Sequence, residues 1–353
     1  MTGADIAIGA LACAGSAGLT ALVRRFALKH GFLDVPNDRS SHARVTPRGG
    51  GLAIVVVSAA AGVGLLLTHS VSGRLVVALL GGGAAVAGVG FVDDRRPVRP
   101  VMRLGIHLLA AVWAVAWLGG LADVQIGAQV IHLGAVGDVL AVLGIVWTLN
   151  LFNFMDGIDG IAASEAIFIA AAAAMLTPAA LVPAASAGVG VFAGVFACAC
   201  AGFLVWNWPP ARIFMGDVGS GYLGYVIAVL GLQATHANPA AVWVWLILGS
   251  LFFLDATLTL IRRSLRRERV HVAHRSHGYQ WLARRWRSHL SVTLLTSGLN
   301  VLWLLPCAVL ASSFPTRAPW ILVLAQAPLI AGLLVAGAGR RENSDSAAGG
   351  TRS

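Results

Sequence analysis

Hydrophobic residues form long runs along nearly the whole chain, and short polar segments separate these runs. Eleven of the runs approach the roughly 20 apolar residues that a helix needs to cross the hydrocarbon core of a bilayer. The pattern therefore predicts an all-α, polytopic membrane protein with about 11 transmembrane helices. The predicted helices cover approximately residues 5–23, 49–68, 73–92, 103–122, 135–153, 158–177, 185–206, 217–234, 240–262, 290–312 and 318–338.

The composition supports a membrane environment. Of the 353 residues, 58% are hydrophobic and only 11% are charged, and the mean hydropathy is +0.80. Soluble globular proteins carry about 25% charged residues, so the composition excludes that class. The four cysteines lie inside apolar runs without the spacing of metal ligands, and we expect them to be small buried hydrophobic residues.

Positive charges are distributed unevenly over the loops between the predicted helices. If the amino terminus is outside, alternate loops and the carboxyl-terminal tail hold 23 of the 25 lysines and arginines, leaving Arg74 and Arg317 on the other side. Cytoplasmic loops carry such an excess of positive charge. We therefore expect an external amino terminus and a site on the cytoplasmic face. The net charge of +10 follows from this topology and gives no reason to expect binding to nucleic acid.

The chain shows no soluble domain and no internal repeat. Residues 1–338 are expected to form a single membrane domain. Residues 339–353 form a polar tail that we expect to be disordered and cytoplasmic.

The first polar segment, residues 34–51, ends in the glycine triplet Gly49–Gly51. Its prolines and glycines keep it out of regular helix. Exposed backbone N–H groups beside Arg39, His42 and Arg48 would suit an anion, so the segment is interpreted as a phosphate-cradling loop. An ordinary basic loop is the alternative.

Two adjacent carboxylates, Asp93 and Asp94, stand where the third predicted helix ends. Acidic residues at a membrane surface have an electrostatic cost unless they meet a cation or a polar partner. The pair therefore indicates a metal, hydroxyl or phosphate partner. A salt bridge to Arg95 or Arg96 is the simpler alternative.

A strip of oxygen-bearing side chains ends the fifth predicted helix. Asn150, Asn153 and Asp156 recur every three residues and thus lie near one helical face, with Asp159 one further turn along. Such a set at the water edge of a membrane helix is hard to explain by packing. We interpret it as part of a functional site.

Another polar segment, residues 207–220, brings Asp217 to the start of the eighth predicted helix, between glycines and near Ser220. A lone carboxylate in this position is well suited to a hard cation that keeps its waters and bridges phosphate oxygens. Asp217 is therefore the expected magnesium ligand. An N-cap role is the alternative.

The last polar loop carries histidines at positions 271, 274 and 277. No cysteine and no HExxH pattern accompanies them, which argues against zinc. Contacts from His274, Arg275 and His277 to phosphate or sugar are the favoured interpretation, and a solvated basic loop is the alternative.

Together these motifs resemble the polyprenyl-phosphate N-acetylhexosamine-1-phosphate transferases. The resemblance rests on five segments in order: Pro47–Gly51, Asp93–Asp94, Asn150–Gly160, Phe214–Ser220 and His274–His277. It implies transfer of an N-acetylamino-sugar 1-phosphate from a UDP-sugar to undecaprenyl phosphate, with release of UMP. It also implies Mg²⁺, with Mn²⁺ as a substitute, a cytoplasmic cleft in a bacterial inner membrane, and compatibility with a homodimer.

The resemblance also suggests roles for individual residues. Asp217 looks like the metal ligand, and Asp93, Asp94, Asp156 and Asp159 look like catalytic residues. Substrate contacts are expected from the following side chains: His42, Arg48, Asn150, Asn153, Asn207, His274, Arg275 and His277.

Two departures favour one branch of the family. The segment His274-Arg-Ser-His277 differs from the three contiguous histidines of the muramoyl-pentapeptide branch, and the first loop lacks that branch's lysines. The chain is similar instead to the branch that primes O-antigen and other surface glycans, whose donors include UDP-GlcNAc, UDP-FucNAc and UDP-QuiNAc. We expect direct attack by the lipid phosphate, with a double displacement through an aspartyl phosphate as the alternative. A transporter or flippase is the other class considered, but its polar residues would be expected near the bilayer midplane.

Overall fold

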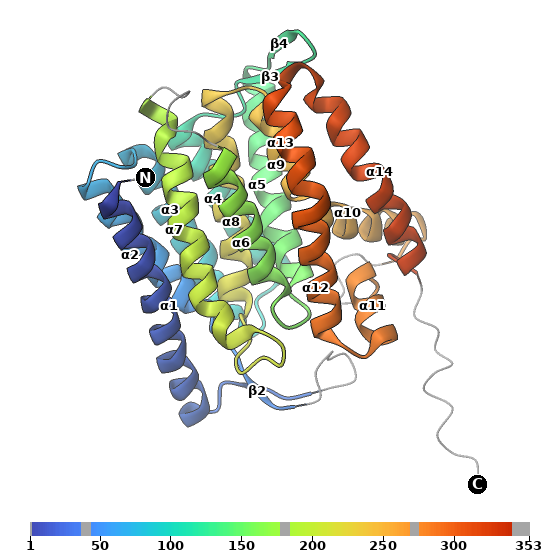
Figure 1. The fold of residues 1–353 in the computed structure, drawn as a ribbon. Helices are drawn as coiled ribbons and strands as arrows, with labels where there is room; N and C mark the ends of the chain where they lie inside the picture. Colours follow the sequence, from blue (N-terminus) through green and yellow to red (C-terminus); the bar gives the residue numbers. More distant parts are fainter. Residues whose placement is uncertain (1, 37–43, 177–183, 269–274, 341–353) are drawn as a thin grey trace.

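The computed structural model describes residues 2–36, 44–176, 184–268 and 275–340. In these residues the chain is an all-α polytopic membrane protein, with a bundle of long helices and two short hairpins (Figure 1). The helices that match the first eight predicted runs are α1 (Gly3–His30), α2 (Leu52–Leu67), α3 (Gly73–Asp93), α4 (Pro100–Leu118), α5 (Ala135–Met155), α6 (Ile161–Leu176), α7 (Ala184–Asn207) and α8 (Asp217–Ala237).

The remaining helices follow the same order along the chain. They are α9 (Ala241–Leu248), α10 (Ser250–Leu265), α11 (Gly278–Trp286), α12 (His289–Leu299), the π-helix η1 (Asn300–Leu304), α13 (Leu305–Ser313), the 3₁₀ turn η2 (Pro315–Arg317) and α14 (Ala318–Ala336). Each predicted apolar run therefore contains helix. Of the described helices, eight are long and apolar enough to cross a membrane, or up to nine if a bent pair counts as one. The count of eleven spans and the external amino terminus stay predictions.

The ninth predicted run is not the single straight helix that its apolar pattern suggested. The chain breaks at Gly249, and the axes of α9 and α10 differ by 73°. A Cβ atom on Gly249 would lie 2.5 Å from the ring of Phe253, so a larger residue at the break would require this ring to move. As a result, α10 projects sideways toward α14 (Figure 1).

Two antiparallel hairpins stand at opposite ends of the bundle (Figure 1). One pairs β1 (Leu33–Asp34) with β2 (Thr46–Pro47), and the other pairs β3 (Asp123–Ile126) with β4 (Gln129–His132). The second hairpin turns at Gly127, whose φ is +61°. The hydrophobic pattern alone did not predict either hairpin.

Helix α8 is the centre of the bundle, since it is buried along most of its length and packs against α3, α5 and α7. The glycine triplet Gly81–Gly83 of α3 permits α8 and α4 to approach closely. A Cβ on Gly82 would lie 1.9 Å from the hydroxyl of Tyr225, which donates to the carbonyl of Ala78 at 2.8 Å. The four cysteines form no disulfide; Cys200 and Cys307 are buried, as expected, whereas Cys13 and Cys198 are half-buried.

The predicted disordered tail lies, from residue 341 onward, outside the described residues. Its disorder and the single-domain organisation of residues 1–338 therefore stay predictions.

Candidate active site

Four carboxylates meet where helices end on the face of the bundle that carries β1 and β2. Asp93 is the last residue of α3 and Asp94 follows it, Asp156 follows α5, and Asp217 is the first residue of α8. Alternate helices run in opposite directions, so these ends, far apart in the sequence, reach the same face. The structure thus brings together four of the acidic residues that the sequence singled out.

Two arginines bridge these carboxylates. Arg48 contacts Asp94 through Nε at 2.9 Å and Asp217 through Nη2 at 2.8 Å. Arg103 of α4 pairs through Nη1 with Asp93 and lies 3.3 Å from the second oxygen of Asp217. Sequence reasoning had counted Arg103 only toward the topology. Its place shortly after Asp93 and Asp94, at the start of the next predicted helix, is the signal that could have identified it.

The simpler explanation of the acidic pair named the wrong arginines. The guanidinium of Arg95 lies over the rings of Phe91 and Phe32, at 3.9 and 4.8 Å from their centroids. The partners of Asp93 and Asp94 therefore come from other segments of the chain.

Asp94 caps helix α8 from outside that helix. Its carboxylate accepts the backbone N–H groups of Asp217 at 2.9 Å and Val218 at 3.1 Å, which have no partner within the helix. Asp217 is consequently not the N-cap of its own helix, and its side chain points to the arginines. Gly216 makes this possible, because its φ is +77° and a Cβ there would lie 2.5 Å from the Asp94 carboxylate.

The glycine end of the predicted phosphate-cradling loop packs against the bundle, while its residues 37–43, with Arg39 and His42, lie outside the described residues. The N–H groups of Gly50 and Gly51 donate to the carbonyls of Phe214 and Met215, each at 2.9 Å, so they are not available to cradle a phosphate. A Cβ on Gly51 would lie 2.3 Å from the Cα of Gly219. The glycines let this loop pack against the start of α8, and they hold Arg48 beside the carboxylates.

Burial and mutual repulsion change the acidity of the carboxylates that lie beyond the helix ends. Burial raises the pKa of Asp94 to about 6, against the opposing effect of the Arg48 charge. Burial, together with repulsion from Asp217, raises the pKa of Asp156 well above its usual range. Four acidic groups thus lie together against two arginines, and the raised pKa values of Asp94 and Asp156 show that the arginines do not fully offset burial and mutual repulsion.

The donor set fits Mg²⁺. Within the described ranges no group of three or more His, Cys, Asp or Glu side chains could hold a metal. Mg²⁺, however, is commonly held by one or two carboxylates plus waters and substrate phosphates. Asp93 and Asp217 both contact Nη1 of Arg103, and the cluster holds more acidic than basic side chains. These two carboxylates therefore suit this mode of binding.

The polar strip of α5 extends the site. The amide of Asn153 accepts from Arg103 at 3.3 Å and donates to the hydroxyl of Ser220 at 2.9 Å. Asn150 donates to the carbonyl of Val146 in its own helix at 2.7 Å, and its amide also interacts with the buried His107. Asn153 therefore belongs to the acid and arginine cluster, whereas Asn150 lies at its inner edge.

Asp159 and Asn207 form a separate group of contacts. Asp159 accepts the N–H of Ala211 at 3.0 Å and lies 3.3 Å from Nδ1 of His289. Asn207 is buried, accepts from the N–H of Gly160 at 3.0 Å and donates to the carbonyl of Ile213 at 2.9 Å. These bonds hold the loop after α7 against α6 and α12. They give both side chains a structural role, and the predicted catalytic and substrate roles stay predictions.

Helix α11 is held by an aspartate that the sequence did not reveal as important. Asp255 of α10 is 2% exposed and accepts the N–H groups of Gly278 at 2.7 Å and Tyr279 at 2.9 Å. His277 is equally buried, at 3.6 Å from the same carboxylate. The hydroxyl of Tyr279 donates to the carbonyl of Phe154 at 3.0 Å, which joins α11 to the end of α5. A lone aspartate in an apolar run was the available signal.

Replacement of Asp255 by alanine is expected to detach α11. The change leaves two N–H groups at the buried start of α11 without their acceptor, at a cost of about 1–3 kcal/mol each. Hydrogen–deuterium exchange should then rise at residues 278–286 while α3 and α8 keep their protection. Asp138→Ala, on the first turn of α5 at the opposite end of the bundle, is the control. Unchanged exchange in α11 would contradict the role assigned to Asp255.

Three further side chains that were predicted to contact the substrate lie outside the described residues or at their edge. His42 and His274 lie outside the described residues. Arg275 is at the edge of the described chain, and its carbonyl accepts from Arg284 at 2.8 Å. Their predicted substrate contacts stay predictions.

Comparison with known proteins agrees with this architecture. Glycosyl transferase family 4 matches residues 76–235, the segment that holds Asp93, Asp94, Asp156 and Asp217. The chain is 29% identical over 302 residues to the probable undecaprenyl-phosphate N-acetylglucosaminyl 1-phosphate transferase of Bacillus subtilis (strain 168), covering 84% of this chain and 82% of that protein.

Two further relatives come from mycobacteria. The decaprenyl-phosphate N-acetylglucosaminephosphotransferase of Mycobacterium tuberculosis (strain ATCC 25618 / H37Rv) is 29% identical over 310 residues, with 78% of this chain and 75% of that protein covered. The phospho-N-acetylmuramoyl-pentapeptide-transferase of Mycobacterium sp. (strain KMS) is 32% identical over 307 residues, with 73% and 82% covered.

The fold and the site define a polytopic membrane protein whose acidic helix ends gather on one face of the bundle. The chain belongs to glycosyl transferase family 4, the polyprenyl-phosphate N-acetylhexosamine-1-phosphate transferases. Because the relatives include both N-acetylglucosaminyl and muramoyl-pentapeptide enzymes, they do not separate the two branches, and the branch stays a prediction.

Proposed function

We propose that this protein transfers an N-acetylamino-sugar 1-phosphate from a UDP-sugar to undecaprenyl phosphate and releases UMP. The observation that carries the proposal is the cluster in which Arg48 and Arg103 bridge Asp93, Asp94 and Asp217, where α3 ends and α8 begins. The names of the relatives support the same reaction.

The chemistry requires two anions to approach each other. An oxygen of the lipid phosphate forms a bond to the β-phosphorus of the UDP-sugar, and the bond from that phosphorus to the oxygen shared with the α-phosphate breaks. The sugar phosphate is now attached to the lipid phosphate, and UMP leaves with the electron pair of the broken bond. Positive charge near the phosphates stabilises this transition state. Arg48 and Arg103 are the cations of the described residues that lie against the acidic cluster.

Asp217, with Asp93 beside it, would hold Mg²⁺, and Mn²⁺ would substitute. When bound, the ion supplies charge neutralisation at the phosphates. The protein's own contribution is to keep Asp217 fixed at the start of α8 through the cap from Asp94. Asp93 or Asp94 would orient the lipid phosphate or accept its proton.

The proposal includes a location and a pathway. The positive loops support a site on the cytoplasmic face of a bacterial inner membrane. Motif differences from the muramoyl-pentapeptide branch support the priming of O-antigen or another surface glycan. A homodimer stays a prediction from the sequence.

The test is formation of UMP and of a lipid-linked sugar by the purified protein. The assay contains undecaprenyl phosphate, Mg²⁺ and one of several donors, including UDP-GlcNAc, UDP-FucNAc, UDP-QuiNAc and UDP-MurNAc-pentapeptide. We expect product with UDP-GlcNAc, UDP-FucNAc or UDP-QuiNAc, and none after removal of the metal by EDTA. Product with the pentapeptide donor would overturn the branch assignment. A folded protein that moves substrate across vesicles without releasing UMP would establish the transporter alternative.

A further inference from the structure

A buried carboxyl group lies inside the bundle, apart from the acidic cluster. Glu165 belongs to the second turn of α6 and is 1% exposed. In the part of the chain that the structure describes, it forms no ion pair, and its one hydrogen bond comes from Nδ2 of Asn300 at 2.6 Å. A carboxyl group within an apolar helix of a membrane protein is costly unless it is paired. Glu165 therefore requires a specific explanation.

The same two side chains each leave one buried acceptor without a hydrogen-bond partner among the described residues. These atoms are Oε1 of Glu165 and Oδ1 of Asn300. Two acceptors cannot bond to each other, but a hydrogen on Oε1 lets the carboxyl group donate to Oδ1 while Oε2 accepts from Nδ2. Turning the amide around does not remove the need for this hydrogen, because the amide oxygen would then face the acceptor Oε2. A neutral carboxylic acid at Glu165 satisfies both side chains.

Asn300 shares one face of its helix with two side chains that contact Asp159. It follows Thr293 by seven residues, or about two turns, and Thr293 follows His289 by four residues. The buried hydroxyl of Thr293 donates to the carbonyl of Asp159 at 2.9 Å, and Nδ1 of His289 lies 3.3 Å from the Asp159 carboxylate. One face of α12 thus holds the α6 segment at two levels, at Asp159 before the helix and at Glu165 within it.

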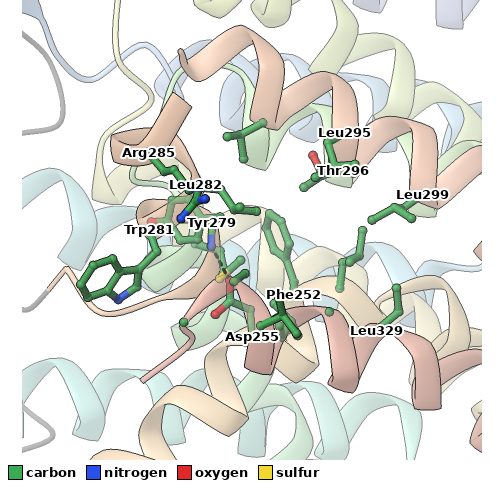
Figure 2. A pocket seen from close by; sticks show the side chains of 18 of the residues that line it. Phe252, Asp255, Tyr279, Trp281, Leu282, Arg285, Leu295, Thr296, Leu299 and Leu329 are labelled. Carbon is green, nitrogen blue, oxygen red and sulfur yellow. Dashed lines mark hydrogen bonds between the residues drawn. The ribbon is translucent and has the colours of Figure 1, made fainter. Parts of the chain in front are cut away.

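An adjoining side of α12 gives no directional contact. Figure 2 shows Leu295, Thr296 and Leu299 on the wall of an apolar cavity of about 1000 Å³, which α10 and α14 also line. Contacts between hydrocarbon surfaces are non-directional, so they leave the rotation and register of a helix undefined. Thr293 and Asn300 do not belong to this wall. Their directional hydrogen bonds to the α6 segment therefore set the position of α12.

We infer that Glu165 is a neutral acid joined to Asn300 by two reciprocal hydrogen bonds, and that this pair sets the register of α12 against α6 and so holds Asp159 in place. A buried polar contact is an established means of fixing the register between helices. Both are positioning residues, because they act on the site through Asp159. The kinetic part of the inference rests on the proposed function, in which Asp159 is a predicted catalytic residue.

The first test replaces Glu165 by glutamine. Its amide nitrogen can donate to Oδ1 of Asn300 while its oxygen accepts from Nδ2, so we expect Glu165→Gln to keep the wild-type unfolding midpoint and turnover. The infrared difference spectrum, wild type minus variant, should show the C=O stretching band of a protonated carboxyl group. A carboxylate band in its place, or a variant with a lower midpoint, would overturn the neutral pair.

The second test is Asn300→Leu, which removes both hydrogen bonds and leaves the acid without a partner. Hydrogen–deuterium exchange should rise at residues 157–165. Turnover should fall about tenfold or more, since a displacement of about 1 Å at a catalytic group can reduce the rate about 10²-fold. Asn300→Ser, a smaller change, provides the same comparison if the leucine variant does not fold. Unchanged exchange at residues 157–165 would reject the positioning role.

Ser58→Ala is the matched control. Ser58 is also buried, and its hydroxyl contacts that of Tyr222 at 2.8 Å, which joins α2 to α8. The change removes an interhelical contact elsewhere in the bundle and should leave exchange at residues 157–165 as in the wild type. An equal rise in exchange there would show a general loss of stability and reject the specific role of Asn300. The infrared and exchange results do not depend on turnover, so they stand even if the wild-type protein releases no UMP and the proposed function fails.

Discussion

Replacement of Asp217 by asparagine is expected to reduce metal-dependent turnover by about 10²–10³-fold or more. Asp217 is the residue that both Arg48 and Arg103 contact, and it is the expected magnesium ligand. Asparagine has nearly the same shape but removes the charge that would attract the ion, and loss of one electrostatic contact to a transition state commonly has an effect of this size. The measurement is UMP release at saturating donor over a range of Mg²⁺ concentrations.

The control for this variant is Asp123→Asn. Asp123 is a carboxylate at the opposite end of the bundle, where it pairs with His132 in the hairpin of β3 and β4. It should keep wild-type turnover. Gel filtration and the thermal unfolding midpoint should show that the Asp217 variant is folded. Near-normal turnover by a folded Asp217→Asn protein would reject Asp217 as the metal ligand.

Replacement of Gly90 by alanine is expected to disturb both stability and turnover. A Cβ there would lie 2.4 Å from the carbonyl oxygen of Asp217 and 2.7 Å from the nitrogen of Val218, both of which are backbone atoms that cannot rotate away. The start of α8 must therefore shift from α3. Overpacking of this kind costs roughly 1–3 kcal/mol, and a displacement of about 1 Å at a catalytic group can reduce the rate about 10²-fold.

Gly88 provides the matched comparison on the same helix. A Cβ on Gly88 would meet no atom within 4 Å, so Gly88→Ala adds the same methyl group to α3 without a collision. We expect Gly88→Ala to keep the wild-type unfolding midpoint and turnover, while Gly90→Ala lowers both. Equal behaviour of the two variants would show that the contact between α3 and α8 does not control the site.

The sequence predicted the all-α membrane fold because each helix needs a continuous apolar run, which is a local property. It also selected Asp93, Asp94, Asp156 and Asp217 from three separate segments, and the structure brings these residues together. The sequence also predicted that these residues lie on one face of the bundle. Consecutive membrane helices run in opposite directions, so every second connection lies on the same side of the bilayer.

The features that sequence reasoning missed depend on contacts between distant segments. Arg103 and Asp255 belong to no local motif, and their partners lie on other helices. The first polar loop was predicted to bind phosphate, but the N–H groups of Gly50 and Gly51 at its end donate to the carbonyls of residues 214 and 215. The bend at Gly249 was missed because hydropathy does not distinguish a straight helix from a broken one.

The cap that Asp94 places on α8 also bears on the biosynthesis of the protein. The two partners are 123 residues apart, so during translation α3 enters the membrane long before the residues of α8 are made. Until then the carboxylate of Asp94 has no helix to cap, and Arg48 has only one of its two acids. The cluster of carboxylates and arginines is therefore completed only after α8 has been made and has docked against α3.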